Sequence, residues 1–203
     1  MTDKFKDLNG VLLQGHIKIH DPNSGEVLID KRNAIHYENM SISLAESLGN
    51  AGQGWIYEMS FGNGGTNVDP TGIITYLTPN STGTNASLYN QTFTKVVDDR
   101  SVNNVDPVRN KIETRHVSGT NYTDILVTCL LDYGEPSGQD AFDTATNTED
   151  LFIFDELGLK SYNNDETFLI THVLFHPVQK SLNRLIQIDY TLRIQSLSGL
   201  LGD

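Results

Sequence analysis

Apolar and polar residues alternate in short runs along most of this chain, and turn-forming residues separate the runs. In residues 16–20 two isoleucines hold alternate positions, which places both on one face of an extended strand. A turn follows at residues 21–25, where proline sets one backbone angle and asparagine and glycine tolerate positive φ. A second apolar run at residues 26–30 completes the pattern, so residues 11–30 are predicted to form a β-hairpin.

Runs of the same kind continue to the end of the chain. The further predicted strands are residues 55–61, 73–76, 91–97, 111–117, 123–132, 151–157, 168–175 and 184–195. Asn, Thr and Ser are frequent between them, which is typical of β-strands joined by ordered loops. We therefore expect a mainly β fold: an antiparallel β-sandwich, jelly-roll-like or related, with one short helix and long ordered loops.

The short helix is predicted at residues 37–48. Met40, Leu44 and Leu48 recur there at helical spacing, and Gly49 and Asn50 supply a stop signal. The apolar stripe of Met40, Leu44 and Leu48 is expected to belong to the core.

The length of the chain suits one domain, so we assign residues 1–203 to a single β-rich structural domain. Residues 1–10 are expected to form an N-terminal arm and residues 196–203 a C-terminal tail. Two connections, residues 78–87 and 134–150, are longer than a compact domain needs, and both are polar and poor in charge. We expect them to reach across to a neighbouring subunit.

The charge of the chain limits its partners. A formal net charge of −12 and a pI near 4.7 argue against a direct grip on nucleic acid, which needs Lys and Arg against phosphates. No stretch has the apolar length of a secretion signal or a membrane span, so we expect synthesis in a cytoplasm and no membrane contact. The single cysteine, Cys129, sits in an apolar run and is expected to be buried and unreactive.

A glycine-rich segment is the first candidate site; it consists of Gly62, Asn63, Gly64, Gly65 and Thr66. It has the glycine density of a phosphate-binding loop, but it lacks the lysine of that motif and no helix follows it. We interpret it as a tight turn that needs positive φ or the close approach of another chain, and therefore as part of a protein interface.

Leucines in the tail are the second candidate site. Leu197, Leu200 and Leu201 follow the last predicted strand. An apolar tail is a natural element for docking to a partner. The predicted interface therefore combines these leucines with the glycine-rich segment.

No motif in the chain assembles a catalytic or metal site. Histidines occur at His16, His20, His36, His116, His172 and His176. None forms an HExxH motif, and two residues four apart on a strand lie about 13 Å apart, too far to share a metal. The acidic clusters near Asp98 and at residues 163–166 lack the spacing of an EF-hand and are interpreted as solvated loops. Asp155 and Glu156 are neighbours on a predicted strand and are expected to point to opposite faces, which does not suit joint acid–base chemistry. Without a nucleophile motif either, we expect no catalytic residue, no cofactor and no metal, and hence no enzyme.

Three segments of the chain resemble structural proteins of contractile-tailed bacteriophages. They are GHIKIHDPNSGEVLIDKRNAIHYENMS, MSFGNGGTNVDPTGIITYLTPN, and the closing FDELGL followed by FLITHVLFHPVQKSLNRLIQIDYTLRI. The resemblance implies a virion component of neck, collar, tail or baseplate type, made in the host bacterial cytoplasm. It also implies symmetric assembly with copies of itself, such as a ring, and with other virion proteins of the head, neck or tail. It brings no catalytic residues.

The first functional hypothesis is a non-enzymatic virion structural protein at the neck, collar or head–tail junction. A position in the tail or baseplate, as a fibre adaptor, or as a capsid decoration protein is the alternative within this class. A carbohydrate-binding module is the alternative from another class, prompted by Trp55 and the Asn- and Asp-rich loops. Against it, Trp55 and Tyr57 flank Ile56 within a predicted strand, where aromatic side chains more often belong to the core. A hydrolase with a spatially assembled site ranks third.

Overall fold

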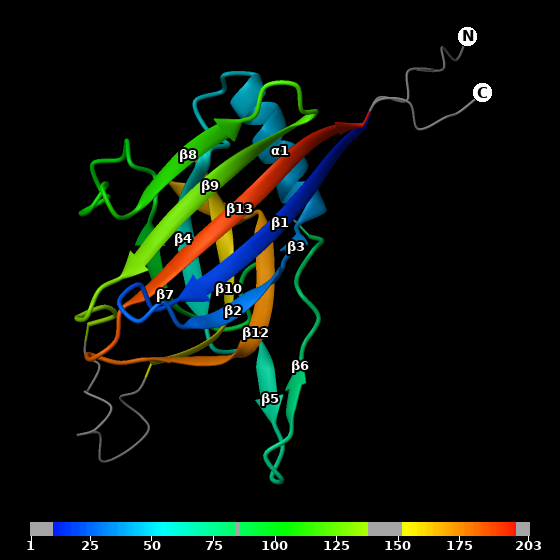
Figure 1. Ribbon diagram of the computed structural model, residues 1–203. Helices are drawn as coiled ribbons and strands as arrows, with labels where there is room; N and C mark the ends of the chain where they lie inside the picture. The colour runs from blue at the N-terminus through cyan, green and yellow to red at the C-terminus, as the bar shows by residue number, and fades with distance from the viewer. Residues whose placement is uncertain (1–9, 84–85, 138–151, 198–203) are drawn as a thin grey trace.

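Two antiparallel β-sheets face each other in the computed structural model, which describes residues 10–83, 86–137 and 152–197 (Figure 1). The first sheet has the strand order β2 (Val27–Arg32), β1 (Gly10–His20), β13 (Ile186–Leu197), β9 (Tyr122–Leu131) and β8 (Lys111–His116). The second has the order β3 (Ala34–Ile35), β12 (Thr171–Lys180), β10 (Phe152–Asn163), β4 (Ile56–Gly62) and β7 (Gln91–Val96), with β11 (Glu166–Leu169) also paired to β10. The prediction of a mainly antiparallel β-sandwich is therefore confirmed.

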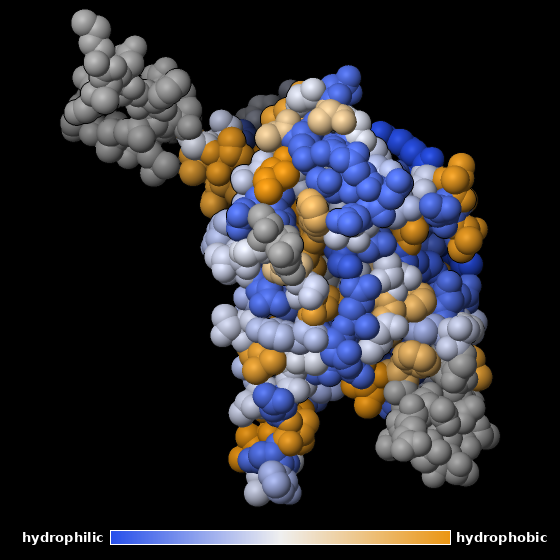
Figure 2. Space-filling model, turned by 180° about the vertical axis from the view of Figure 1, so that it is seen from behind, coloured by the Kyte–Doolittle hydropathy of each residue, from blue (hydrophilic) through white to orange (hydrophobic). Residues whose placement is uncertain are grey.

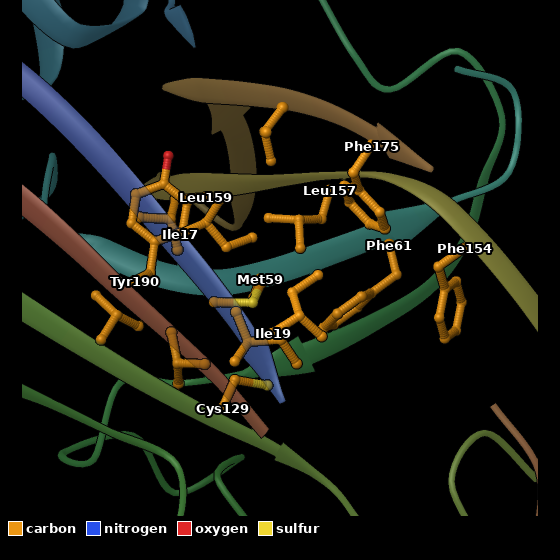
Figure 3. Close-up of a cluster of buried hydrophobic side chains, with 14 of the residues drawn as sticks. Ile17, Ile19, Met59, Phe61, Cys129, Phe154, Leu157, Leu159, Phe175 and Tyr190 are labelled. Atoms are coloured by element: carbon orange, nitrogen blue, oxygen red, sulfur yellow. The ribbon is translucent and has the colours of Figure 1, made fainter. Parts of the chain in front are cut away.

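The core lies between the two sheets and follows from the alternation seen in the sequence. Ile17 and Ile19 of β1 are both buried on the one face that the alternation predicts, and they lie in the same core cluster as Met59 and Leu159 of the opposite sheet (Figure 3). Tyr190 of β13 is fully buried with its hydroxyl hydrogen-bonded to the amide of Asn33, so its polar end is satisfied inside the core.

The helix α1 (Tyr37–Leu48) has the predicted bounds. His36 caps its N-terminus, because its Nδ1 accepts a hydrogen bond from the backbone N–H of Asn39 at 3.3 Å. Met40 is buried, but Leu48 is 88% exposed, so the predicted stripe is wrong at its last member. The buried residues of the helix are Asn39, Met40 and Ser43, and at about 100° per residue Leu48 falls outside the arc that they define.

Strand β10 is longer than the alternation predicts. It continues from Phe152 through Asn163, past the predicted end at residue 157, and pairs with β11 through a tight turn. Asn164 and Asp165 adopt positive φ in that turn, so the acidic segment 163–166 is the tip of a β-hairpin with a two-residue loop. Gly158, Lys160 and Ser161 interrupt the apolar pattern, and the strand continues because partners elsewhere in the chain accommodate them.

Polar connections and the cysteine also have defined places. In the first long connection, Asn80 donates its backbone N–H to His172, and Ser81 accepts one from Tyr37, so this part packs on its own chain. Most of the second connection, from residue 138 on, lies outside the described residues.

Cys129 is buried as predicted, and burial raises the pKa of its thiol to about 12. No helix within the described ranges is long and apolar enough to cross a membrane.

Lys180, the last residue of β12, is a buried cation at one end of the sandwich. It is fully buried, and its Nζ donates to the carbonyl oxygens of Ser181 at 2.9 Å and Tyr133 at 3.4 Å. Burial lowers its pKa to about 8, against the opposing effect of the carboxylates of Glu135 and Asp132.

The lowered pKa of Lys180 predicts a specific dependence of stability on pH. Below pH 8 this lysine is charged in both the folded and the unfolded chain. Between pH 8 and about 10.5 it is neutral when folded and charged when unfolded, so the unfolded state binds one more proton and the free energy of unfolding rises with pH. In urea titrations, wild type should therefore gain stability relative to Lys180→Met across this window, by at most about 1.4 kcal/mol per pH unit. Parallel profiles for the two proteins would contradict the assignment.

Candidate functional site

A buried carboxylate in β10 organises the glycine-rich segment. Glu156 is fully buried, and its Oε1 accepts hydrogen bonds from the backbone N–H groups of Gly64 at 3.1 Å and Asn90 at 2.8 Å. Its Oε2 accepts from the backbone N–H of Tyr89 at 2.9 Å and from Nε2 of His172 at 3.0 Å. One side chain thus joins four donors from three separate parts of the chain.

The protonation of this cluster follows from its hydrogen bonds. Nδ1 of His172 accepts the backbone N–H of Asn80 at 2.9 Å, so the proton of the neutral ring is on Nε2, which donates to Glu156. Burial alone would raise the pKa of Glu156. The hydrogen bonds from His172 and from the backbone N–H groups of Asn90, Tyr89 and Gly64 outweigh burial and hold the pKa below its ordinary value of 4.5.

The neighbouring carboxylate holds the same turn. Asp155 is also buried, and it accepts hydrogen bonds from the backbone N–H groups of Gly65 and Thr66, each at 2.9 Å, and from the hydroxyl of Thr66. The register between β10 and β12 shifts at Asp155, because β12 bulges there. Pro177 lies in that bulge. We expected the side chains of Asp155 and Glu156 to point to opposite faces of the sheet. In the structure the glycine-rich segment passes across β10, so both carboxylates bind its backbone N–H groups.

This arrangement anchors structure and leaves little scope for chemistry. Both carboxylates are buried, each oxygen already accepts at least one hydrogen bond, and the donors are mostly backbone N–H groups. The described part of the chain places no three His, Cys, Asp or Glu side chains where they could hold a metal ion. His16 and His20 instead each contact a carboxylate, of Asp30 at 2.8 Å and of Asp189 at 2.9 Å.

The glycines of the predicted interface face the interior of their own chain. A Cβ on Gly62 would lie 2.5 Å from the carbonyl oxygen of Asn90, and one on Gly65 would lie 2.6 Å from the side chain of Leu174. Neither glycine has positive φ, so close approach of other backbone and side-chain atoms is the reason for the glycines, but not the approach of another chain that we expected. The approaching segments belong to the same chain, and of the five residues only Asn63 is exposed. Gly64 and Thr66 are partly buried.

The leucines of the predicted tail fall in two places. Leu197 is the final residue of β13 and pairs with Gly10 of β1, so it belongs to the sheet and the tail assignment is wrong for residues 196–197. The cause is the length of β1, which offers a pairing partner up to that point. Leu200 and Leu201 lie outside the described residues.

A separate hairpin projects from the sandwich directly after the glycine-rich segment. Among the described residues, strands β5 (Thr66–Val68) and β6 (Ile74–Tyr76) pair only with each other, and they lead away from the body of the molecule (Figure 1). Val68 and Ile73 are each 61% exposed, and apolar atoms gather on this projection in Figure 2. We call residues 66–76 the hairpin arm.

The hairpin arm has a defined shape although little packs against it. At its tip, Oδ1 of Asp69 accepts hydrogen bonds from the backbone N–H groups of Thr71 at 2.8 Å and Ile73 at 3.0 Å, and Gly72 adopts a φ of 86°. At its base, the carboxylate of Asp155 holds Thr66. Sequence reasoning identified the strand at residues 73–76 but not its exposure, because the alternation of a strand does not tell whether a second layer covers it.

An aromatic groove opens at one edge of the sandwich. Its volume is about 710 Å³, and Trp55, Tyr57 and Tyr162 line it together with the loop that follows β7. Trp55 is 39% exposed while Ile56 between the two aromatic residues is buried, so the expectation that Trp55 belongs to the core is wrong. The alternation has the opposite phase: Ile56 is buried in the core, and its aromatic neighbours line the groove.

Comparison with protein-family models, with curated proteins and with solved structures finds no match to this chain. Its function is therefore inferred from its own geometry and from the resemblance in its sequence.

Proposed function

We propose that this chain is a non-enzymatic structural component of a tailed-bacteriophage virion that assembles by protein–protein contacts at the neck, collar or head–tail junction. A tail, baseplate, fibre-adaptor or capsid-decoration position is the alternative within the same class. The virion assignment rests on the resemblance of the three sequence segments. The observation that carries the assembly role is the hairpin arm.

The hairpin arm has the properties of a docking element. An isolated two-stranded hairpin is at best marginally stable in water, and contact with a third element stabilises it. Val68 and Ile73 expose apolar surface that burial in an interface would remove from water, at roughly 25 cal/mol per Å². The hydrogen-bonded tip at Asp69 fixes the shape of the arm before docking, which reduces the entropy lost on binding.

The charge distribution favours this arm as the contact between copies. The chain carries a net charge of −12, so two copies repel each other over most of their surfaces. Residues 66–76 contain a single charged residue, Asp69. A nearly uncharged apolar element can approach an acidic neighbour with little electrostatic cost.

The outer strands of the first sheet are less suited to assembly. In β8, Lys111, Glu113 and Arg115 alternate along the exposed edge, and β2 ends in Asp30, Lys31 and Arg32. Charged side chains on an edge strand oppose pairing with another chain. A β-rich chain can also assemble by pairing exposed strand edges of two copies. The charged edges disfavour that mode here, so we propose contact through the hairpin arm instead.

The experiment is the oligomeric state of the full-length protein by sedimentation velocity. We expect wild type to form oligomers and the double variant Val68→Ser, Ile73→Ser to shift to monomer while its chain stays folded, because both side chains are largely exposed in the single chain. The matched control is Val105→Ser, Val108→Ser, since these valines are also largely exposed but lie in another loop; it should assemble like wild type.

Two results would contradict the assembly role: a wild-type protein that stays monomeric at high concentration, or equal assembly of the hairpin and control variants. Electron microscopy of the phage particle tests the virion assignment separately. A particle map in which no density fits this fold would overturn that assignment even if the isolated protein assembles.

A further inference from the structure

The aromatic groove lies where two outer strands leave the sandwich open. β7 is the outer strand of the second sheet and β8 that of the first, and the groove is bounded by the start of β4, by residues 98–103 after β7, by Ile112 of β8 and by the β10–β11 turn. A volume of about 710 Å³ falls within the range of about 300–1,000 Å³ typical of small-molecule sites. The groove is independent of the hairpin arm and of the proposed assembly.

Three aromatic rings form one wall of the groove. Trp55 and Tyr162 stack with ring centroids 4.9 Å apart and an interplanar angle of 16°, and Tyr57 lies tilted against Tyr162 at 5.5 Å. Because the two rings stack face to face, each covers one face of the other. A ligand therefore meets one flat face, that of the exposed Trp55 turned away from Tyr162, and is not enclosed by rings on several sides. A flat aromatic surface suits the C–H face of a sugar ring, whereas recognition of a quaternary ammonium group uses a cage of rings.

The polar ends of these rings are held in place. The hydroxyl of Tyr162 donates to Oδ1 of Asp165 at 2.9 Å, and the hydroxyl of Tyr57 accepts from Nδ2 of Asn103 at 2.9 Å. The facing loop is also tied down, since the carbonyl oxygen of Asp98 accepts from the backbone N–H of Ser101 at 3.1 Å. A site whose side chains are fixed before binding loses less entropy when the ligand arrives.

Hydrogen-bonding groups of both kinds surround the aromatic wall. Carboxylates of Asp98, Asp99 and Glu166 supply acceptors, and Arg100 and Ser101 supply donors. Sugar hydroxyls both donate and accept, so they match such a mixed lining. The carboxylates of the groove outnumber its one guanidinium group, which disfavours acidic sugars through like-charge repulsion.

We propose that this groove binds neutral oligosaccharides, with the ring of Trp55, backed by Tyr162, as the stacking surface. In an assembly of many copies, weak binding at each groove would add up to strong attachment to a glycan-covered surface. That consequence depends on the proposed assembly; the binding site itself does not.

The first experiment is a printed array that carries neutral hexose and N-acetylhexosamine oligosaccharides beside sialylated and uronic-acid ones, probed with the full-length protein. Neutral oligosaccharides should be retained, and Trp55→Ala should reduce the signal at least tenfold. Tyr37→Ala is the matched control because Tyr37 is an exposed aromatic residue on α1, outside the groove; it should bind like wild type.

The second experiment needs no variant. Trp55 is the only tryptophan of the chain, so its fluorescence reports on the groove directly. Titration of wild type with the best neutral oligosaccharide of the array should change the emission in a saturable way. The proposal is overturned if no neutral oligosaccharide binds, if Trp55→Ala binds equally well, or if the emission responds to tetramethylammonium and not to the oligosaccharide. None of these results bears on assembly, which is measured by sedimentation.

Discussion

Replacement of Glu156 by glutamine should lower the free energy of unfolding by about 3 kcal/mol, although the two side chains have nearly the same shape. Each carboxylate oxygen accepts two hydrogen bonds, one pair from Gly64 and Asn90 and the other from Tyr89 and His172. Glutamine has one accepting oxygen, so its NH₂ group must face two N–H donors in either orientation. Urea denaturation at pH 7 measures the loss.

The matched control is Glu113→Gln on the exposed strand β8. Its carboxylate is about half exposed and contacts only Lys111 among the ion pairs that the structure describes, so its replacement should change stability by less than about 0.5 kcal/mol. Equal effects at the two positions would show that the buried cluster contributes nothing beyond a general charge effect.

Acid should narrow the difference in stability between wild type and Glu156→Gln. The pKa of Glu156 is lower in the folded chain than its ordinary value of 4.5, so its contribution to stability is complete above that value and is lost as the pH falls through the folded pKa. Once protonated, the side chain resembles glutamine in carrying a donor. The difference in the free energy of unfolding should therefore shrink as the pH falls below 4.5, by at most about 1.4 kcal/mol per pH unit. A constant difference from pH 7 to pH 3 would contradict the role of the ionised carboxylate.

Gly158→Ala should also be strongly destabilising, by about 2–3 kcal/mol, because a methyl group has no room there. A Cβ on Gly158 would lie 2.4 Å from the carbonyl oxygen of Thr171 and 2.4 Å from a methyl group of Leu169. The Leu169 side chain can rotate, but the backbone of Thr171 is fixed by its pairing with Ile35 and by the hydrogen bond from the N–H of Leu159 to its hydroxyl.

Gly134→Ala is the control for this prediction. A Cβ at Gly134 meets no atom within 4 Å, and Gly134 does not have positive φ, so alanine should be neutral or slightly stabilising there. Thermal unfolding of the two variants separates the steric effect at Gly158 from the general effect of replacing a glycine. Similar melting temperatures would mean that β10 and β12 move apart at little cost.

The predictable part of the fold is the part with a local period. The hairpin at residues 11–30 and the bounds of α1 follow from residues close together in the chain, and both match the structure. The alternation does not predict the extension of β10 through Lys160, because the burial of this lysine depends on a distant partner. Its Nζ lies 3.5 Å from the carboxylate of Glu58, which is about a hundred residues earlier in the sequence. A polar residue is compatible with a buried strand only when such a partner arrives, and a local pattern does not show this.

The sequence alone indicated an antiparallel sandwich, because a period of two with one apolar face must bury that face against another layer, and the chain offers only one short helix for that purpose. Only the tertiary structure decided which side chains are buried and which are exposed. Glu156 is buried because four donors from distant segments converge on it, whereas Trp55 and the hairpin arm are exposed because no second layer among the described residues covers them. Those choices depend on contacts between segments far apart in the chain, and the candidate functional surfaces follow from them.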